Sequence, residues 1–499
     1  MTDVLSHTPT PFKRDHLSSG RARAAMSGSL WSLVNILVAT VISAAVFLLA
    51  SRFLSPADFG VVALAATIVM FISCAIPIAF GDALVQRTDL RDDHLDTVFW
   101  ACAGFGSVLY IALCLSTPWI AAWAETPALN ALLPVIGIRL ILESLTVVPT
   151  SLVTRSVQFR FIALRTTLAN MLGGGVCIAM VLMGSGYWAL AISQVLSSLV
   201  SVLVMLPAAR WRPGIAVTRQ AVGDLWNFGI FSAGNRLLNE MRLDQLLIGF
   251  LGGPQMLGLF FFARRLFQMV SDMTVGVFTP VSNVLLASMQ SEPEKRRKAF
   301  MMATYAATAV AVPTFVGLFI LADSAVPLVF GAQWADAVAA VQGFAVIGMI
   351  AGLGIVQAAL IRSQGRADWW FWYQAAVQFS ALPLIALLYS HGLGVVMTAL
   401  ALRTMIFWPL SVRETLRILD MRPMDYFGNL RGPIGASLVM AAAMVAVPWV
   451  LQDAHSTLWV LLAQACVGAL AYLGAGAVLS WGQAQELLTL LRQRKAHAR

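Results

Sequence analysis

The chain has 499 residues, of which 59% are hydrophobic and 11% are charged. Soluble proteins carry about a quarter charged residues, so this composition excludes a water-soluble globular body. In a soluble protein the net charge of +9 would suggest nucleic acid as a partner. A membrane protein instead gathers Lys and Arg in its cytoplasmic loops, and we therefore expect no nucleic-acid binding.

The chain begins with a polar, basic stretch over residues 1–27, which we predict to be a cytoplasmic segment. Fourteen apolar stretches follow, most of them close to the roughly 20 residues that a helix needs to cross a bilayer. The sequence therefore predicts an all-α polytopic membrane protein. The predicted spans are residues 29–50, 60–80, 97–118, 129–152, 162–183, 187–208, 227–250, 257–281, 302–322, 337–360, 370–389, 393–412, 433–451 and 458–480.

The spans divide into two groups of six and a final pair. A faint repeat supports this division, because residues 53–60 and 250–258 share a pattern and each joins two spans. Internal repeats are common in secondary transporters, whose substrate site lies between the halves. The alternative is that Gly and Pro are simply frequent in short membrane loops. The expected parts are a first lobe over 28–215, a second lobe over 216–415, two further spans over 416–481 and a basic cytoplasmic tail over 482–499.

Basic residues fall almost entirely on one side of the predicted membrane. Of the 33 Lys and Arg residues, 26 lie in or beside the tails and loops of that side, and the loops of the other side hold only Arg52. Cytoplasmic loops carry such an excess. We therefore expect both termini to lie in the cytoplasm.

Several kinds of chemistry find no support in the sequence. No HExxH zinc motif occurs, and none of the four lysines follows a glycine, which argues against a Walker A site. The cysteines lie inside apolar stretches without a CxxC pair, so we interpret them as packing residues. We expect no metal, no cofactor and no catalytic residue. The cysteines are Cys74, Cys102, Cys114, Cys177 and Cys466.

Five stretches resemble the Wzx-type polysaccharide flippases of the multidrug/oligosaccharidyl-lipid/polysaccharide (MOP) exporter superfamily, in its lipopolysaccharide and exopolysaccharide branch. They are LSPADFG at 54–60, LVQR at 84–87, HLDTVFW at 94–100, GYWAL at 186–190 and LDQLLIG at 243–249. The resemblance implies two six-helix lobes around a central cavity, plus two C-terminal helices, working by alternating access. It also implies a bacterial inner-membrane location and a cargo linked to undecaprenyl pyrophosphate. Membrane lipids, the polysaccharide polymerase and the export machinery would be its other partners.

Charged residues inside the spans are candidates for the substrate path, because each costs at least about 2.5–3.5 kcal/mol to place in a bilayer. Six arginines against four acids leave a positive surplus, which suits pyrophosphate because Arg binds phosphate oxygens bidentately. The candidate binding residues are Arg139, Arg236, Arg242, Arg264, Arg265 and Arg403. The candidates for ion or proton coupling are Glu143, Glu240, Asp244 and Asp272.

Some of these residues lie one helical turn apart. Arg139 and Glu143 are four residues apart, and Arg236 and Glu240 repeat the spacing. Each pair is either a neutralised bridge within its helix or part of a polar face that lines the cavity. Arg264 and the arginine after it project about 100° apart, so we expect only one of the two to face the cavity.

We therefore expect a flippase that carries an oligosaccharide repeat unit from the cytoplasmic to the periplasmic leaflet. One alternative is an ion-coupled multidrug or small-molecule antiporter, in which acids should outnumber bases in a cavity for cationic drugs. A second is a polysaccharide polymerase, which should carry a large outer loop, whereas the longest outer loop predicted here is 323–336. An added role as a scaffold for a biosynthetic complex also stays open.

Overall fold

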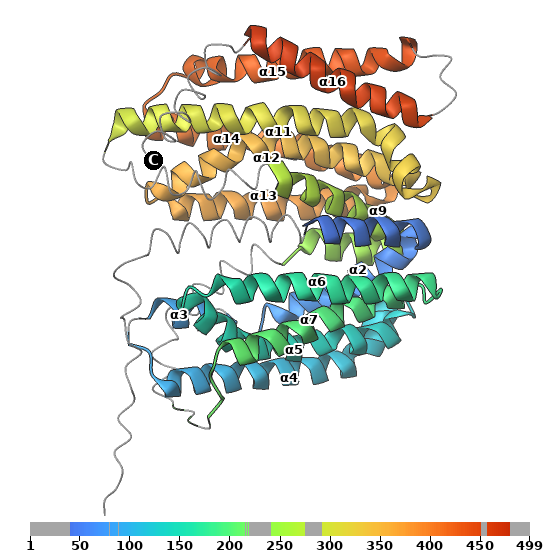
Figure 1. The fold of residues 1–499 in the computed structure, drawn as a ribbon, viewed down its shortest axis with the longest axis vertical. Helices are drawn as coiled ribbons and strands as arrows, with labels where there is room; N and C mark the ends of the chain where they lie inside the picture. The colour runs from blue at the N-terminus through green and yellow to red at the C-terminus, as the bar shows by residue number, and fades with distance from the viewer. Residues whose placement is uncertain are drawn as a thin grey trace, which may run out of the picture.

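A computed structural model describes residues 40–78, 80–87, 89–214, 216, 218, 241–274, 292–450 and 457–479. Within these ranges the regular structure is helical and no strand occurs, which confirms the predicted all-α class (Figure 1). The helices are Thr40–Phe53, α2 (Pro56–Ser73), α3 (Phe80–Gln86), α4 (Asp92–Trp123), α5 (Leu129–Arg155), α6 (Phe159–Leu182), α7 (Trp188–Ala208), α9 (Leu243–Thr274), α11 (Pro293–Phe330), η2 (Ala332–Ala337), α12 (Val338–Ser363), α13 (Ala367–Leu388), η3 (Tyr389–His391), α14 (Leu393–Leu419), α15 (Pro423–Val450) and α16 (Thr457–Leu479).

The described helices fit the polytopic plan. Twelve of them are long and apolar enough to cross a membrane, and the shorter helix Thr40–Phe53 belongs to the first predicted span. Helix α9 belongs to two predicted spans, because Gly253 has a φ of 73° and breaks it into two segments. Glycine adopts a positive φ without steric cost. The beginning of the seventh predicted span lies outside the described residues.

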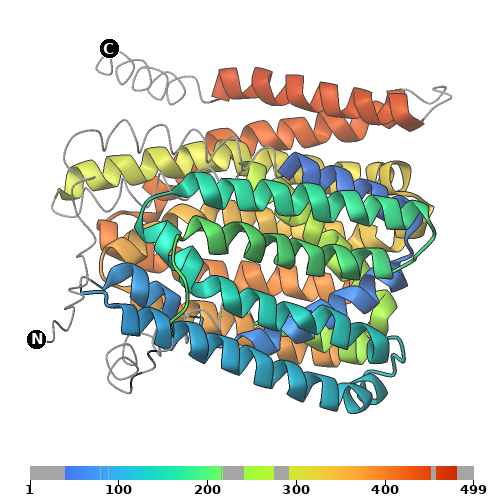
Figure 2. The same ribbon diagram turned by 60° about the horizontal axis from the view of Figure 1, so that its bottom comes forward.

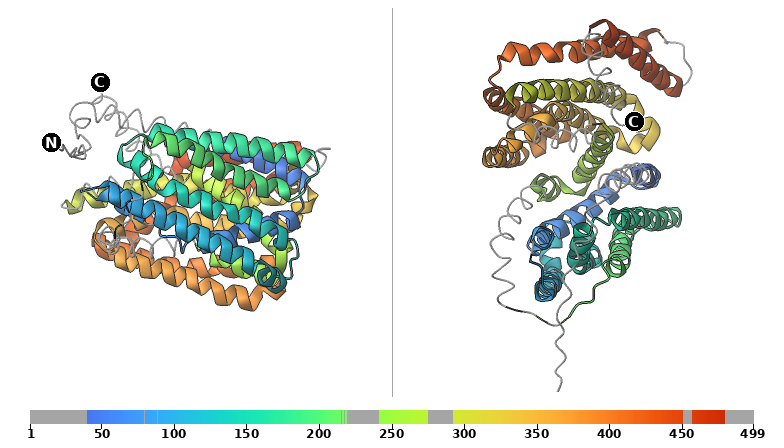
Figure 3. Two further views of the ribbon diagram at one scale, coloured as in Figure 1. Left: turned by 90° about the horizontal axis from the view of Figure 1, so that it is seen from below. Right: turned by 60° about the vertical axis from the view of Figure 1, so that its left-hand side comes forward.

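The helices form two groups that lie against each other (Figure 1). The N-terminal lobe consists of helix Thr40–Phe53 and α2 to α7, and the C-terminal lobe consists of α9 and α11 to α14. Helices α15 and α16 pack together on the outer side of α11. Figures 2 and 3 show that the helices of both lobes run in broadly the same direction, so that the loops gather at two ends.

The two ends differ in charge. The chain turns beside Arg87, Arg155, Arg210 and Arg366 at one end, which we name the basic end. The opposite end, which we name the Arg52 end, holds the turns after α4, α6, α11 and α13. Arg52 itself donates from Nε to the carbonyl oxygen of Val329 at 2.7 Å and from Nη2 to that of Leu328 at 2.9 Å. It therefore caps the last turn of α11, which gives a structural reason for a lone basic residue at this end.

The outer loop predicted at 323–336 is largely helical, and that prediction is wrong in extent. Helix α11 runs on to Phe330, and η2 begins at Ala332 after a single glycine. The stretch contains Asp323 and Pro327 and lies beyond the most apolar part of the helix, so hydropathy alone ended the span too early. The connection is even shorter than the sequence indicated.

The lobes meet where the two repeated segments cross. Pro56 and Gly60 belong to the first turns of α2, and Pro254 and Gly258 hold the same relative positions in α9. A methyl group at Gly60 would overlap the carbonyl group of Pro254, and one at Gly258 would overlap that of Pro56. The contact is reciprocal, which favours a true internal repeat over a chance recurrence of Gly and Pro.

Aromatic residues extend this contact between the two lobes at the Arg52 end. Trp334 of η2 is fully buried, stacks on Phe262 with a ring separation of 4.0 Å and meets Phe59 edge-on at 5.2 Å. Its indole N–H donates to the carbonyl oxygen of Ser51 at 2.8 Å. Phe59 and Ser51 belong to the N-terminal lobe, whereas Trp334 and Phe262 belong to the C-terminal lobe. We refer to the Gly60–Gly258 crossing and the Trp334 contacts together as the seal.

Candidate functional site

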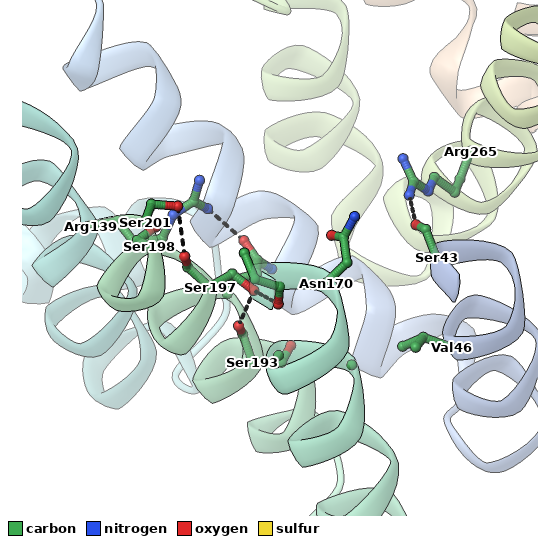
Figure 4. A pocket seen from close by; sticks show the side chains of 13 residues that line it. Ser43, Val46, Arg139, Asn170, Ser193, Ser197, Ser198, Ser201 and Arg265 are labelled. Atoms are coloured by element: carbon green, nitrogen blue, oxygen red, sulfur yellow. Dashed lines mark hydrogen bonds between the residues drawn. The ribbon is translucent and has the colours of Figure 1, made fainter. Parts of the chain in front are cut away.

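A polar pocket of about 370 Å³ opens at the interface of the lobes. Its walls come from helix Thr40–Phe53, α5, α6 and α7 of the N-terminal lobe and from α9 of the C-terminal lobe. Figure 4 shows serine and asparagine side chains in the middle of the view, with Arg139 toward one side and Arg265 toward the other. A ligand that fills this pocket therefore touches both lobes.

Arg139 lines the pocket from α5. Its Nε and Nη2 donate to Oε1 of Glu143 at 3.1 and 2.8 Å, and its Nη1 donates to Oε1 of Gln194 on α7 at 2.6 Å. The ion pair indicated by the four-residue spacing is therefore present. Glu143 offsets much of the charge of Arg139, and Gln194 fixes the plane of its guanidinium group.

Arg265 reaches the pocket from the opposite lobe. Its Nη2 donates to the hydroxyl group of Ser43 on the first helix. Serine is neutral, so this contact leaves the charge of Arg265 in place, and Asp272, two turns further along α9, is the acid that interacts with it electrostatically. The preceding residue, Arg264, does not line this pocket. Adjacent positions on a helix point in different directions.

The wall between the arginines is made of small polar side chains. Ser193, Ser197 and Ser201 follow one another at four-residue spacing on α7 and line the pocket together with Asn170 of α6. The serine hydroxyls donate to backbone carbonyl groups, among them Ser197 to Ala169 at 3.1 Å. Their oxygens can still accept hydrogen bonds from a ligand. Sequence reasoning missed these residues, because serines in membrane helices more often mark helix packing than binding.

A second charged cluster lies on α9 and α14. Asp244 accepts from Nη1 of Arg264 at 2.6 Å, although the two residues are twenty positions apart. Arg403 of α14 also interacts electrostatically with Asp244, and its Nη1 donates to the carbonyl oxygen of Val377 at 2.9 Å. The cluster therefore holds two guanidinium groups against one carboxylate.

The pairing of Asp244 with Arg264 is one that spacing within a single helical turn could not indicate. The chain reverses at Gly253, so the second segment of α9 returns alongside the first and brings Arg264 to Asp244. Arg236 and Glu240 lie outside the described residues. Arg242 has a φ of 38° immediately before α9 begins.

Removing the carboxylate of this cluster should destabilise the fold. With Asp244→Asn, both Arg264 and Arg403 lose the charge that compensates them. The Asp244–Arg264 pair is half-buried, and a hydrogen bond to a charged group contributes about 1.5–3 kcal/mol. We expect a clear fall in the melting temperature of the detergent-purified protein. The double variant Asp244→Asn with Arg264→Gln should recover much of the loss, because it also removes one of the uncompensated charges. A double variant no more stable than the single one would contradict the pairing.

Comparison with known proteins places the chain among proteins of glycan assembly. A family described as polysaccharide biosynthesis protein matches residues 48–339, which is more than half of the chain. The chain belongs to this family. The teichuronic acid biosynthesis protein TuaB of Bacillus subtilis is 24% identical over 73% of this chain and 79% of its own length. The lipopolysaccharide biosynthesis protein WzxC of Escherichia coli is 22% identical over 72% of this chain and 74% of its own length.

Solved structures agree on the fold. The lipid II flippase MurJ, in an inward closed conformation, superposes with a TM-score of 0.70 at 14% identity over 91% of this chain and 98% of its own. An inward-facing multidrug resistance transporter of the MOP superfamily gives a TM-score of 0.60 at 16% identity over 77% of this chain and 94% of its own. The family member described here therefore has the fold of the MOP superfamily, as its sequence indicated.

The HLDTVFW stretch of this family member holds the connection between its lobes. Asp96, near the start of α4, is buried, and its two carboxylate oxygens accept from the backbone N–H groups of Gly214 at 2.9 Å and Ala216 at 3.3 Å. The indole N–H of Trp100 donates to the carbonyl oxygen of Gly214 at 2.7 Å. The chain that leaves α7 is thus fixed to α4 before it continues toward the C-terminal lobe.

Asp96→Asn should release this connection. The amide places a donor opposite one of the two backbone N–H groups, and a buried donor left without an acceptor costs about 1–3 kcal/mol. Amide hydrogen exchange over residues 211–218 should therefore accelerate by about 5- to 150-fold. Asp92→Asn, an exposed acid at the beginning of the same helix, is the matched control and should leave this exchange unchanged. Equal exchange in both variants would show that Asp96 does not hold the connection.

Proposed function

We propose that this protein flips an oligosaccharide repeat unit linked to undecaprenyl pyrophosphate from the cytoplasmic to the periplasmic leaflet of the bacterial inner membrane. Such a step would serve the assembly of an exopolysaccharide or lipopolysaccharide. The family assignment and the names of TuaB and WzxC support a place in polysaccharide biosynthesis. The fold shared with a lipid II flippase supports transport of a lipid-linked sugar.

The composition of the pocket is the observation that carries the proposal. Among its described lining residues, two are arginines and none is acidic. The planar guanidinium group matches the oxygens of a phosphate, and it remains charged even when partly dehydrated. Ser193, Ser197 and Asn170 offer hydrogen bonds to sugar hydroxyls beside the phosphates. A cationic drug would find no carboxylate among these described lining residues, which disfavours the multidrug antiporter.

The distribution of charge supports the orientation. Excess Lys and Arg marks the cytoplasmic side of a membrane protein, so we assign the basic end to the cytoplasm and the Arg52 end to the periplasm. The seal then closes the periplasmic side in the conformation described here. A substrate would enter between the lobes from the cytoplasmic leaflet, with its polar head in the pocket and its lipid tail left in the bilayer.

The contacts of Arg265 suggest how binding of the substrate would move the two lobes relative to each other. A pyrophosphate group is a stronger acceptor than the hydroxyl group of Ser43, so it would replace this contact and join Arg265 to Arg139 across the interface. The two lobes, which we assign to residues 28–215 and 216–415, would then move together at the basic end and apart at the seal. The head group would be exposed to the periplasm in this second state.

The acids expected to couple ion flow are engaged by arginine where the structure describes them. Glu143 contacts Arg139 and Asp244 contacts Arg264. We propose that coupling acts through these contacts: a cation held by Glu143 would loosen its pair with Arg139, the arginine of the two that lines the pocket.

Ligand binding to the purified protein tests the proposal. We expect the undecaprenyl-pyrophosphate-linked oligosaccharide to raise the melting temperature, since a ligand at one hundred times its dissociation constant stabilises by about 2.7 kcal/mol. The corresponding undecaprenyl monophosphate should stabilise less, and ethidium should not stabilise. Stabilisation by ethidium without any by the pyrophosphate lipid would favour the antiporter.

A further inference from the structure

A second pocket, of about 500 Å³, lies at the basic end between the last turns of α14 and the first turns of α15. The chain turns sharply there, because Asp420 adopts a left-handed backbone with a φ of 46°. Tyr426 is buried and accepts a hydrogen bond from Nε2 of Gln357 at 2.8 Å, which fixes the start of α15 against α12. These contacts fix the shape of the pocket between α14 and α15, which we name the wedge.

The walls of this wedge are apolar. Trp408 and Phe427 meet edge-on with a ring separation of 6.2 Å, and Val412 and Leu416 continue the surface. The apolar surface extends along α14 toward the middle of the membrane, since Leu410 and Ile406, one and two turns before Arg413, are 48% and 72% exposed. Exposed apolar side chains on a membrane helix can pack against an acyl chain. The wedge therefore offers an acyl chain a continuous path.

Two arginines form the polar rim of the wedge. Arg413 and Arg417 are exposed, lie one turn apart on α14 and, within the described part of the chain, donate to no protein acceptor. Other arginines at the basic end are engaged, as Arg366 is with Glu414 and Arg297 is with Asp425. The exposed Asp420 offsets one of the two rim charges. The rim keeps a net positive charge that no group in the described ranges takes up.

The wall holds one more donor without a partner. The indole Nε1 of Trp408 is buried and meets no acceptor among the described residues. A buried donor of this kind costs about 1–3 kcal/mol unless an acceptor is supplied from outside the protein. An ester or phosphate oxygen of a lipid seated in the wedge can supply this acceptor once the Trp408 ring turns, since its Nε1 is closed off in the structure described.

We infer that this wedge is a binding site for one anionic phospholipid of the leaflet at the basic end. The phosphate lies between Arg413 and Arg417, Trp408 donates to a lipid oxygen, and an acyl chain follows Leu410 and Ile406. Arginine at the membrane surface attracts anionic lipid. Arg413 and Arg417 carry the positive charge that complements the negative charge of the lipid phosphate. The site does not depend on the proposed transport function.

Native mass spectrometry of the detergent-purified full-length protein tests this site, with phosphatidylglycerol and phosphatidylcholine added at equal concentration. We expect one phosphatidylglycerol to be retained at least fivefold more than phosphatidylcholine. The double variant Arg413→Ala with Arg417→Ala should lose this preference. Trp408→Phe, which keeps the ring and removes the N–H, should weaken it.

The control is Arg160→Ala with Arg212→Ala, which removes the same charge from exposed positions at the same end but outside the wedge. It should keep the preference. An equal loss in this control would show attraction by overall charge instead of a site and would overturn the inference. Preferential retention of undecaprenyl phosphate over phosphatidylglycerol would also overturn it, because the wedge would then belong to the substrate path.

Discussion

Gly60→Ala and Gly258→Ala should each open the seal at the Arg52 end. At both positions the new methyl group would overlap a backbone carbonyl group of the other lobe, Pro254 for Gly60 and Pro56 for Gly258. Backbone atoms cannot rotate away as a flexible side chain can, so the crossing helices must separate. Overpacking costs about 1–3 kcal/mol, which shifts the balance between closed and open states by about 5- to 150-fold.

Distances between spin labels measure this shift. Glu125 and His391 are exposed at the Arg52 end, in the N-terminal and C-terminal lobes respectively. Labels placed there, after replacement of the native cysteines, should report a longer distance in either glycine variant than in the parent. Gly104→Ala and Gly317→Ala are the controls, because a methyl group at these helical glycines meets nothing within 4 Å.

Transport should fall together with the closed state, since a carrier needs both states to complete its cycle. We expect at least a tenfold loss of flipping in Gly60→Ala, with the control variants near the parent. An unchanged label distance and normal transport in Gly60→Ala and Gly258→Ala would contradict the assignment of this crossing as the seal.

The second large effect is expected at Arg265. Hydrogen bonds to a charged group contribute about 1.5–3 kcal/mol, so Arg265→Ala should weaken binding of the pyrophosphate lipid by about 10- to 150-fold. Arg265→Lys keeps the charge but loses the bidentate geometry, and its affinity should fall between those of alanine and the parent. Titration of the purified protein with the lipid measures these affinities.

Ser43→Ala separates the binding role of Arg265 from its structural role. It removes the hydroxyl group that occupies Arg265 in the substrate-free state, so it should leave lipid affinity unchanged or raise it. If Arg265 only joined the lobes, Ser43→Ala and Arg265→Ala would lower affinity alike. Similar losses in the two variants would therefore remove Arg265 from the binding site.

The membrane plan could be predicted from the sequence because the bilayer imposes it. Each crossing must be apolar and satisfy its own backbone hydrogen bonds, so the spans are visible as separate stretches. The alternation of basic loops adds an independent check on their number. The exception at Arg52 could not be explained in this way, because its acceptors on α11 lie more than 270 positions away.

The site was predictable only in part, because spacing reports on neighbours within one helix. It indicated the Arg139–Glu143 pair, which is one turn apart. It could not indicate Asp244 with Arg264, which meet only because α9 reverses at Gly253, nor Arg265 with Ser43, which belong to different lobes. Spacing could not indicate the role of Asp96 for the same reason, since its partners are backbone groups over a hundred positions further along the chain.

Flipping of fluorescent undecaprenyl-pyrophosphate oligosaccharide in liposomes tests the central claim most directly. The parent protein should move the lipid between leaflets, and Arg265→Ala, reconstituted to the same level and with an unchanged melting temperature, should move it at least tenfold more slowly. Arg160→Ala should flip at the parental rate. Failure of the folded parent to move the lipid, with uptake of a small cation in its place, would contradict the flippase and the role given to the arginine pocket.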